Sequence, residues 1–119
     1  MIQIFGTAKD KVTRAAQRFF ADRGIKVQFV ELKQKAMSKG ELASVAKALG
    51  GMQALYDAKG AHAKERGLQH SAPSGERLAE LLENDPMLLI LPVVRDGTKA
   101  AVGDNPTVWK AFADAAKKI

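Results

Sequence analysis

The first 32 residues constrain the fold more than any other part of the chain. An apolar run, IQIF (2–5), is followed by the small-residue turn GTA and by a stretch with apolar residues at helical spacing. These residues are Val12, Ala15, Ala16, Phe19 and Phe20. Gly24 suits the end of such a helix, and the alternating run KVQFVEL (26–32) predicts a second strand. A strand, a helix over about 11–23 and a second strand predict a right-handed βαβ unit.

The middle of the chain predicts helices. Ser38 and Glu41 have the spacing of a capping box, and the apolar stripe that follows ends at Gly50-Gly51. A second helical segment is expected over about 52–66, and Ser74 is placed to cap a third that ends near Asn84.

The last third predicts two strands and a helix. MLLILPVV (87–94) has the pattern of a buried strand, and Pro92 marks an edge, a bulge or a cis turn near its end. Asp96-Gly97 indicates a hairpin, and Asn105-Pro106 begins a helix that buries Trp109. The order β-α-β, three helices, β-β-α predicts an α/β fold.

The chain has no cysteine, which excludes disulfides, thiolate metal sites and thiol chemistry of its own. Its two histidines, His62 and His70, have no ligand partners at a recognised spacing and are interpreted as surface residues. No metal and no cofactor are therefore expected.

The positive charge is concentrated at one end. Residues 1–39 carry nine Lys or Arg and three Asp or Glu, whereas the other 80 residues carry ten of each. Such a local excess favours anionic partners. No apolar run approaches the roughly 20 residues of a membrane helix, and no signal peptide is recognised, so a cytoplasmic protein without membrane contact is expected.

Four segments together resemble the glutaredoxin-coupled arsenate reductase family and its relatives, which include the Spx regulators. They are IFGTAKDKVTRA, VELKQKAMSKGEL, DAKGAHAKERGL and PMLLILPVV…AAVGDNPTVWKAF, and the resemblance covers essentially the whole chain. It implies a thioredoxin-like fold with a mixed four-stranded sheet. It also implies a single domain over 1–119, with a helical insertion at about 38–84 between the second and third strands.

The family's catalytic cysteine has no counterpart here, because its position is Asp10. A helix start lowers the pKa of a thiol, and a carboxylate uses the same positive potential without forming a bond to arsenic or sulfur. Asp10 is interpreted as an N-cap, with a role as acid, base or ligand, or a partner contact, as the alternatives. Thr13 either bonds a ligand, faces solvent or caps its own helix.

The resemblance also places the family's anion-binding positions. Lys59 matches one arginine and keeps its charge without the planar fork, whereas Leu91 matches another and keeps neither charge nor donors. Lys9 at the helix start is a further candidate for anion binding. The resemblance also implies a cis Leu91–Pro92 bond, beside which such folds pair with extended peptides.

A basic ridge is expected on the first helix. Lys11, Arg14 and Arg18 stand at i, i+3 and i+7, away from the Phe19 face. The ridge is either a solvated face or a docking surface for an acidic protein. No aromatic residues alternate with these charges, so nucleic-acid binding is the weaker alternative.

Two functions follow. The first is a redox-inactive relative of arsenate reductase that acts as a protein-binding or regulatory module. The second is an enzyme or a receptor for a small oxyanion or glutathione, in which Lys9 and Lys59 hold the anion and a ligand or partner supplies the thiol.

Overall fold

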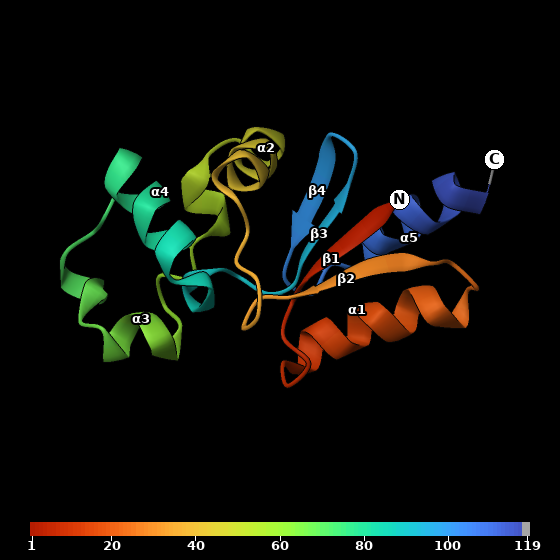
Figure 1. The fold of residues 1–119 in the computed structure, drawn as a ribbon, viewed down its shortest axis with the longest axis horizontal. Helices are drawn as coiled ribbons and strands as arrows, with labels where there is room; N and C mark the ends of the chain where they lie inside the picture. Colours follow the sequence, from red (N-terminus) through yellow and green to blue (C-terminus); the bar gives the residue numbers. More distant parts are fainter. Residues whose placement is uncertain (118–119) are drawn as a thin grey trace.

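The computed structural model describes residues 1–117. In this range a β-α-β unit is followed by a helical segment and then by a hairpin and a last helix (Figure 1). The strands are β1 (Ile2–Gly6), β2 (Val27–Glu31), β3 (Val93–Asp96) and β4 (Lys99–Val102). The α-helices are α1 (Lys11–Asp22), α2 (Lys39–Leu49), α3 (Ala61–Glu65), α4 (Gly75–Asn84) and α5 (Pro106–Lys117). Three short 3₁₀ turns accompany them: η1 (Met52–Leu55), η2 (Leu68–His70) and η3 (Pro86–Leu88).

The four strands form one mixed sheet in the order β2-β1-β3-β4. β1 pairs parallel with β2 and antiparallel with β3, and β3 and β4 form the expected hairpin around Asp96-Gly97. Gly97 has a φ of 61°, a conformation that the tight turn needs and that glycine adopts without strain. The α/β prediction is confirmed.

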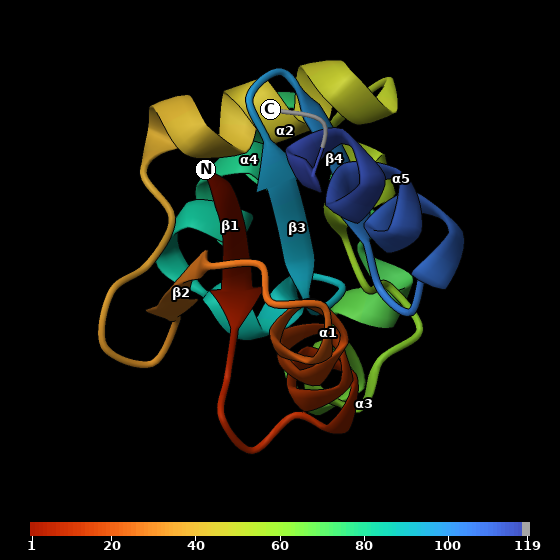
Figure 2. The same cartoon turned by 90° about the vertical axis from the view of Figure 1, so that its right-hand side faces the viewer.

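Each face of the sheet carries its own hydrophobic core. Ile2, Ile4 and Val94 pack with α1 and α5 in what we call the α1–α5 core. Phe5 and Val93 point the other way and pack with the helices that follow β2, in what we call the insertion core. Figure 2 shows α1 and α5 on one side of the strands and α2 and α4 on the other. The alternation of neighbouring residues along β1 and β3 is the period-2 pattern of a sheet buried on both faces.

Several predicted helix ends are confirmed. Ser38 and Glu41 form the reciprocal capping box, and α2 ends at Gly50 in the left-handed conformation with a φ of 89°. Asn105 accepts a hydrogen bond from Val108 N at 3.3 Å at the start of α5, and Trp109 is buried with 2% of its surface exposed.

Two predicted elements are wrong in extent. The segment 52–66 is not one helix: η1 ends at Leu55, a turn ends at Gly60, and only Ala61–Glu65 is α-helical. The strand expected over 87–94 begins only at Val93. Leu88 ends a 3₁₀ turn, and Leu89 makes a single antiparallel bridge to Tyr56. An apolar run of this length indicates that the segment is buried, but tertiary contacts determine whether its backbone is a strand or a turn.

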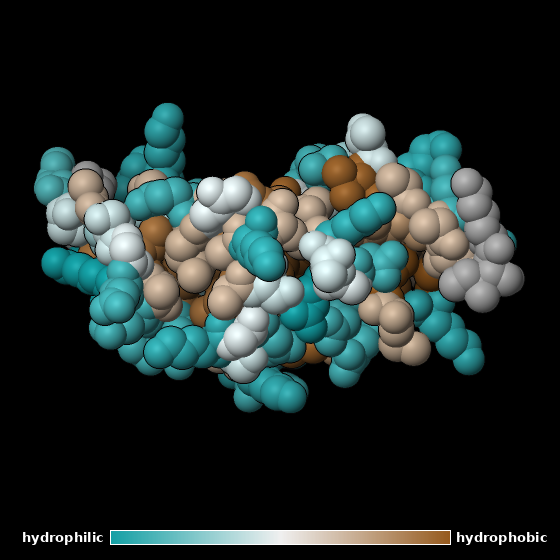
Figure 3. Space-filling view, turned by 90° about the horizontal axis from the view of Figure 1, so that it is seen from above, coloured by the Kyte–Doolittle hydropathy of each residue, from teal (hydrophilic) through white to brown (hydrophobic). Residues whose placement is uncertain are grey.

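The helical segment between β2 and β3 lengthens the molecule. It projects beyond the end of the sheet (Figure 1), and the described chain measures 45 × 27 × 24 Å. Seen from above (Figure 3), hydrophilic side chains are interspersed with small areas of apolar surface. On α2 the exposed residues include Ala43 and Ala48.

Candidate functional site at the start of helix α1

The loop between β1 and α1 is closed by its own hydrogen bonds. Asp10 N donates to Thr7 O at 3.1 Å and lies 3.2 Å from Thr7 Oγ1. Asp10 occupies the N-cap position of α1, where its Oδ2 accepts hydrogen bonds from Thr13 N at 2.8 Å and Thr13 Oγ1 at 2.7 Å. This is the geometry of an N-cap, so the carboxylate is already engaged within the helix start.

Thr13 is not directed to solvent. Its side chain is fully buried against Gly6, where a Cβ atom would lie 2.3 Å from Thr13 Oγ1. The hydroxyl donates to Asp10 and has no exposed surface from which to reach a ligand. The expectation of a solvent-facing hydroxyl is therefore wrong, because the close approach of Gly6 covers it.

A second carboxylate, from Glu31, also reaches the loop. Glu31 is the last residue of β2 and pairs in register with Gly6. Its Oε1 accepts a hydrogen bond from Ala8 N at 2.8 Å, and its Oε2 accepts one from Lys33 N at 3.2 Å. The hydrogen bond from Ala8 N has the largest effect and the one from Lys33 N the next largest, and both lower the pKa of Glu31 below its ordinary value. The carboxylate is therefore ionised at neutral pH.

Sequence reasoning missed Glu31, although a signal for it exists. Parallel strands joined by a crossover helix bring their carboxyl ends to the same edge of the sheet. The last residue of the second strand is therefore a neighbour of the loop that follows the first. A carboxylate at this position is placed to accept an N–H of that loop.

The consequence is a helix start at which three backbone N–H groups are used internally. Ala8 N is bonded to Glu31, Asp10 N to Thr7, and Thr13 N to Asp10. The unpaired N–H groups and positive potential of a helix N-terminus attract anions. Here two carboxylates of the chain itself occupy that position, and an incoming oxyanion meets their negative charge.

The turn before β3 contains the cis peptide bond Leu91–Pro92. Leu91 is half-buried and packs against the insertion core, where it offers no donor to an anion. The backbone on either side of Leu91 is engaged: Ile90 N donates to Leu55 O at 2.8 Å, and Pro92 O accepts from Gly103 N at 3.0 Å. These two backbone groups of the turn are therefore not available to an extended peptide.

The two lysines proposed for anion binding are both exposed, Lys9 in the α1 loop and Lys59 in the turn before α3. Lys59 lines a cavity of about 400 Å³ within the helical segment, together with Tyr56 and Lys64. Lys9 is not among the residues that line it.

The basic ridge on α1 is present as a surface. Lys11, Arg14 and Arg18 are exposed and line one shallow hollow of about 300 Å³ together with Ala15. None of the three cations has an ion pair among residues 1–117. Ala15 was expected in the core, but it lies one turn from Lys11 and from Arg18 and so shares their exposed face.

His62 belongs to a charged cluster that the sequence did not reveal. Its Nε2 lies 2.7 Å from Asp85 Oδ2, to which Arg66 also donates at 2.9 Å. Burial of Asp85 is the largest single influence on its pKa and raises it. The hydrogen bonds from His62 and Arg66 together outweigh burial and hold that pKa below its ordinary value.

Two features are absent from the described residues. Within residues 1–117, no helix is long and apolar enough to cross a bilayer. In the same range, no three His, Asp or Glu side chains are grouped so that they could hold a metal ion.

Comparison with known proteins identifies relatives of this fold. The family model described as the ArsC family matches residues 5–112. A solved structure of a candidate arsenate reductase from Yersinia pestis matches with a TM-score of 0.82 at 20% identity, over 93% of this chain and 99% of that one. An arsenate reductase from Vibrio cholerae matches with a TM-score of 0.79 at 23% identity, over 92% and 95%.

A third solved structure, an arsenate reductase related protein from Brucella melitensis, matches with a TM-score of 0.69 at 22% identity, over 93% and 92% of the two chains. No match was found among curated proteins. These structural similarities establish a shared thioredoxin-like fold, with the mixed sheet that the resemblance implies. Because the family model covers most of the sequence, the chain belongs to the ArsC family.

Proposed function

We propose that this chain is a redox-inactive ArsC-family domain that acts as a regulatory module by binding an acidic protein partner. The supporting observation is the start of α1. The resemblance places Asp10 at the family's cysteine position, and the carboxylates of Asp10 and Glu31 accept hydrogen bonds from N–H groups of the loop and of the first turn of α1. Without a thiolate, the chain has no nucleophile to form the arsenic–sulfur bond of the family reaction.

An assay of arsenate reduction tests the loss of chemistry. The purified chain is incubated with arsenate, glutathione and glutaredoxin, and we expect no turnover above the background without the chain. The Asp10→Cys variant should gain a thiol that reacts with a thiol reagent, yet reduce arsenate poorly, because Leu91 supplies neither charge nor donor. Asp10→Ser is the matched control that keeps a cap without a thiol. Full activity in Asp10→Cys would contradict this account of the anion site.

The basic ridge supports the binding part of the proposal. Lys11, Arg14 and Arg18 form an exposed cationic surface that no acidic side chain of the described residues neutralises. Cations on an accessible helix face attract an acidic protein surface, and salt screens the attraction over about 10 Å at 0.1 M.

Affinity capture from an extract of the source cell tests the ridge. We expect proteins that the unaltered chain retains at low salt, that about 0.5 M salt releases, and that the double variant Arg14→Glu/Arg18→Glu does not retain. Lys99→Glu, which changes an exposed lysine on β4, is the control and should retain them. Equal retention by the double variant would exclude the ridge as the docking surface. Salt-sensitive binding of DNA or RNA that the same variant abolishes would favour a nucleic-acid partner instead.

A second function rests on a different observation. Lys9 and Lys59 are exposed ammonium groups without ion pairs among residues 1–117, so they are available to a small oxyanion or to glutathione. A ligand or a partner would then have to supply the thiol. Calorimetric titration with arsenate, phosphate, sulfate and glutathione separates the two functions. Our proposal expects no saturable binding, whereas binding that Lys59→Ala abolishes would favour the second function.

A further inference from the structure

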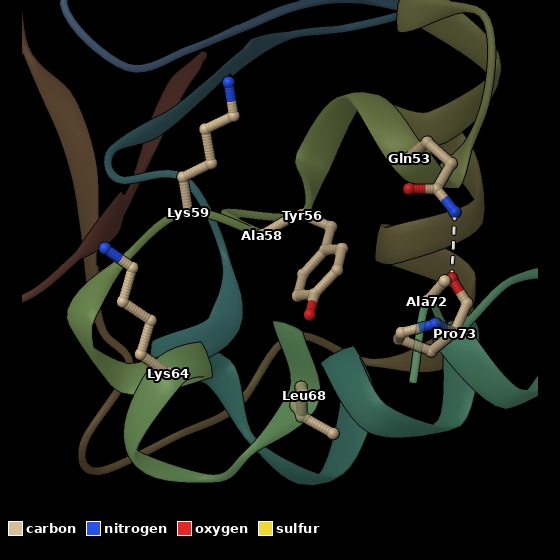
Figure 4. Close-up of a pocket in the computed structure, with 8 residues that line it drawn as sticks. All are labelled: Gln53, Tyr56, Ala58, Lys59, Lys64, Leu68, Ala72 and Pro73. Carbon is tan, nitrogen blue, oxygen red and sulfur yellow. Dashed lines mark hydrogen bonds between the residues drawn. The ribbon is translucent and has the colours of Figure 1, made fainter. Parts of the chain in front are cut away.

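The cavity in the helical segment contains a buried polar group without a partner. Tyr56 is 7% exposed, and its hydroxyl has no hydrogen-bond partner among the described residues. In Figure 4 the ring lies at the centre of the lining, with the hydroxyl directed toward Leu68. A buried hydroxyl that makes no hydrogen bond is unfavourable, so such a group commonly indicates an absent ligand or water.

The cavity is held in shape by the backbone around it. Tyr56 bridges to Leu89, and Asp57 N donates to Leu88 O at 2.9 Å, so the tyrosine is fixed to the segment that leads into β3. On the opposite side, Gln53 Nε2 donates to Pro73 O at 3.0 Å and joins η1 to the loop before α4 (Figure 4). A preformed cavity of about 400 Å³ lies within the size range of small-molecule sites.

The lining combines apolar surface with positive charge. Ala58, Leu68, Ala72 and Pro73 supply the apolar part. Lys59 and Lys64 lie on one side of Tyr56 (Figure 4), and neither has an ion pair among residues 1–117. No acidic residue is found among the described lining residues. An apolar body therefore fits the lining, and an anionic group fits the phenolic donor, with two flexible, exposed lysines on one side of the ring.

We propose that this cavity is a binding site for a small organic acid with an apolar, ring-sized body. The body lies against Leu68 and Pro73, and the carboxylate accepts a hydrogen bond from the Tyr56 hydroxyl. The exposed Lys59 and Lys64 side chains, whose ammonium groups extend away from that hydroxyl in Figure 4, turn toward the carboxylate when the acid binds. The site is independent of the proposed docking ridge, since none of its lining residues belongs to α1. Failure of one proposal leaves the other standing.

The chain offers a specific probe for this site, because Tyr56 is its only tyrosine. In protein labelled with ¹³C-tyrosine, the ring signals therefore come from Tyr56 alone. We expect 2-naphthoate to shift them in a saturable way, with a Kd in about the millimolar range or below. The neutral analogue 2-naphthamide should bind more weakly, because it keeps the ring system and loses the charge. Unmoved Tyr56 signals, or equal binding of the two compounds, would overturn the proposal.

Variants identify the groups that hold the acid. Lys59→Ala and Lys64→Ala should each weaken 2-naphthoate binding by up to about fivefold, as expected for partly exposed ion pairs. Lys47→Ala removes an exposed lysine from α2, which does not line this cavity, and should have no effect. Tyr56→Phe keeps the ring and should weaken binding by about three- to tenfold in calorimetry. Unchanged affinity in all three cavity variants would contradict the assignment.

Discussion

Asp10 uses one carboxylate oxygen for two hydrogen bonds, and both come from Thr13. The N–H bond caps α1, and the hydroxyl bond satisfies a side chain with no exposed surface. Asp10, which the resemblance places at the family's cysteine position, thus has the contacts of a structural cap.

Removal of this cap should therefore destabilise the fold. Asp10→Ala loses the cap and leaves the Thr13 hydroxyl buried without a partner, which together lower the free energy of unfolding by about 2 kcal/mol. Asp10→Asn keeps an oxygen acceptor and should lose less than half as much. Urea unfolding of the three proteins measures the difference. A variant Asp10→Ala as stable as the original chain would show that the carboxylate is held there for another reason.

Gly6 is a second residue that Thr13 constrains, because Thr13 leaves no space for a side chain at position 6. A Cβ atom at position 6 would stand 2.3 Å from Thr13 Oγ1 and 2.6 Å from Thr13 Cγ2, so there is no room for a methyl group. Gly6→Ala should lower the free energy of unfolding by about 2 kcal/mol through overpacking.

A double-mutant cycle with Thr13→Ala tests whether this contact is the cause. Thr13→Ala removes both crowding atoms, so the double variant should be more stable than the sum of the two single changes predicts. If the two changes in the free energy of unfolding are strictly additive, the effect of Gly6→Ala does not come from its contact with Thr13.

At the scale of helices and strands, the predicted helix ends that rest on contacts between residues close in sequence agree with the structure. Ser38, Gly50 and Asn105 mark helix ends by hydrogen bonds within a few residues, and those ends are where the sequence predicts them. MLLILPVV fails as a strand because its first half pairs through Leu89 with Tyr56, a partner 33 positions away in the sequence. The Asp85 cluster cannot be predicted from local patterns for the same reason, because Asp85 is far from its partners in the sequence.

The Asp85 cluster joins the end of α4 to α3 and predicts a pH dependence. His62 and Arg66 hold the pKa of Asp85 below its unfolded value despite the opposing effect of burial. The stability that this adds is therefore fully present above the ordinary Asp pKa of about 3.9 and is lost as the pH falls through the lower, folded value.

Asp85→Asn measures this contribution. At pH 7 the variant should be less stable by about 1 kcal/mol, a value discounted because Arg66 and His62 are partly exposed. The difference from the original chain should shrink below about pH 4 and vanish at lower pH. Asp104→Asn changes an exposed carboxylate on another loop and serves as the control. A difference that stays constant down to pH 2 would mean that ionised Asp85 is not its source.

At the scale of the whole molecule, the sequence predicts the fold better than the site. The order of strands and helices follows from the local spacing of apolar residues and from the capping and turn residues between them. The sheet follows from the βαβ unit and the hairpin. The site depends on tertiary contacts: Glu31 reaches Ala8 across the sheet edge, and Tyr56 is buried among segments from η1 to the loop before α4. No local sequence pattern predicts the cavity around Tyr56.

The arrangement of the two cores leads to a proposal about the whole chain, that it folds as one domain with the helical insertion as an integral part. β3 contributes Val93 to the insertion core and the next residue, Val94, to the α1–α5 core, and both side chains are fully buried. A strand that supports two cores at once couples their stability, because neither core keeps its packing when the strand is lost.

Trp109 lies in the α1–α5 core and Tyr56 in the insertion core, so the chain carries one natural probe in each. Trp109 fluorescence and the Tyr56 ring signals should therefore change at the same urea concentration. Val93→Ala and Val94→Ala are a matched pair on opposite faces, and each should lower the free energy of unfolding by about 2 kcal/mol. If the chain is one unit, either variant moves both transitions equally. A Val93→Ala protein in which Tyr56 unfolds before Trp109 would make the insertion a separate unit, because packing shared through the strands between the two cores is what keeps the two probes together.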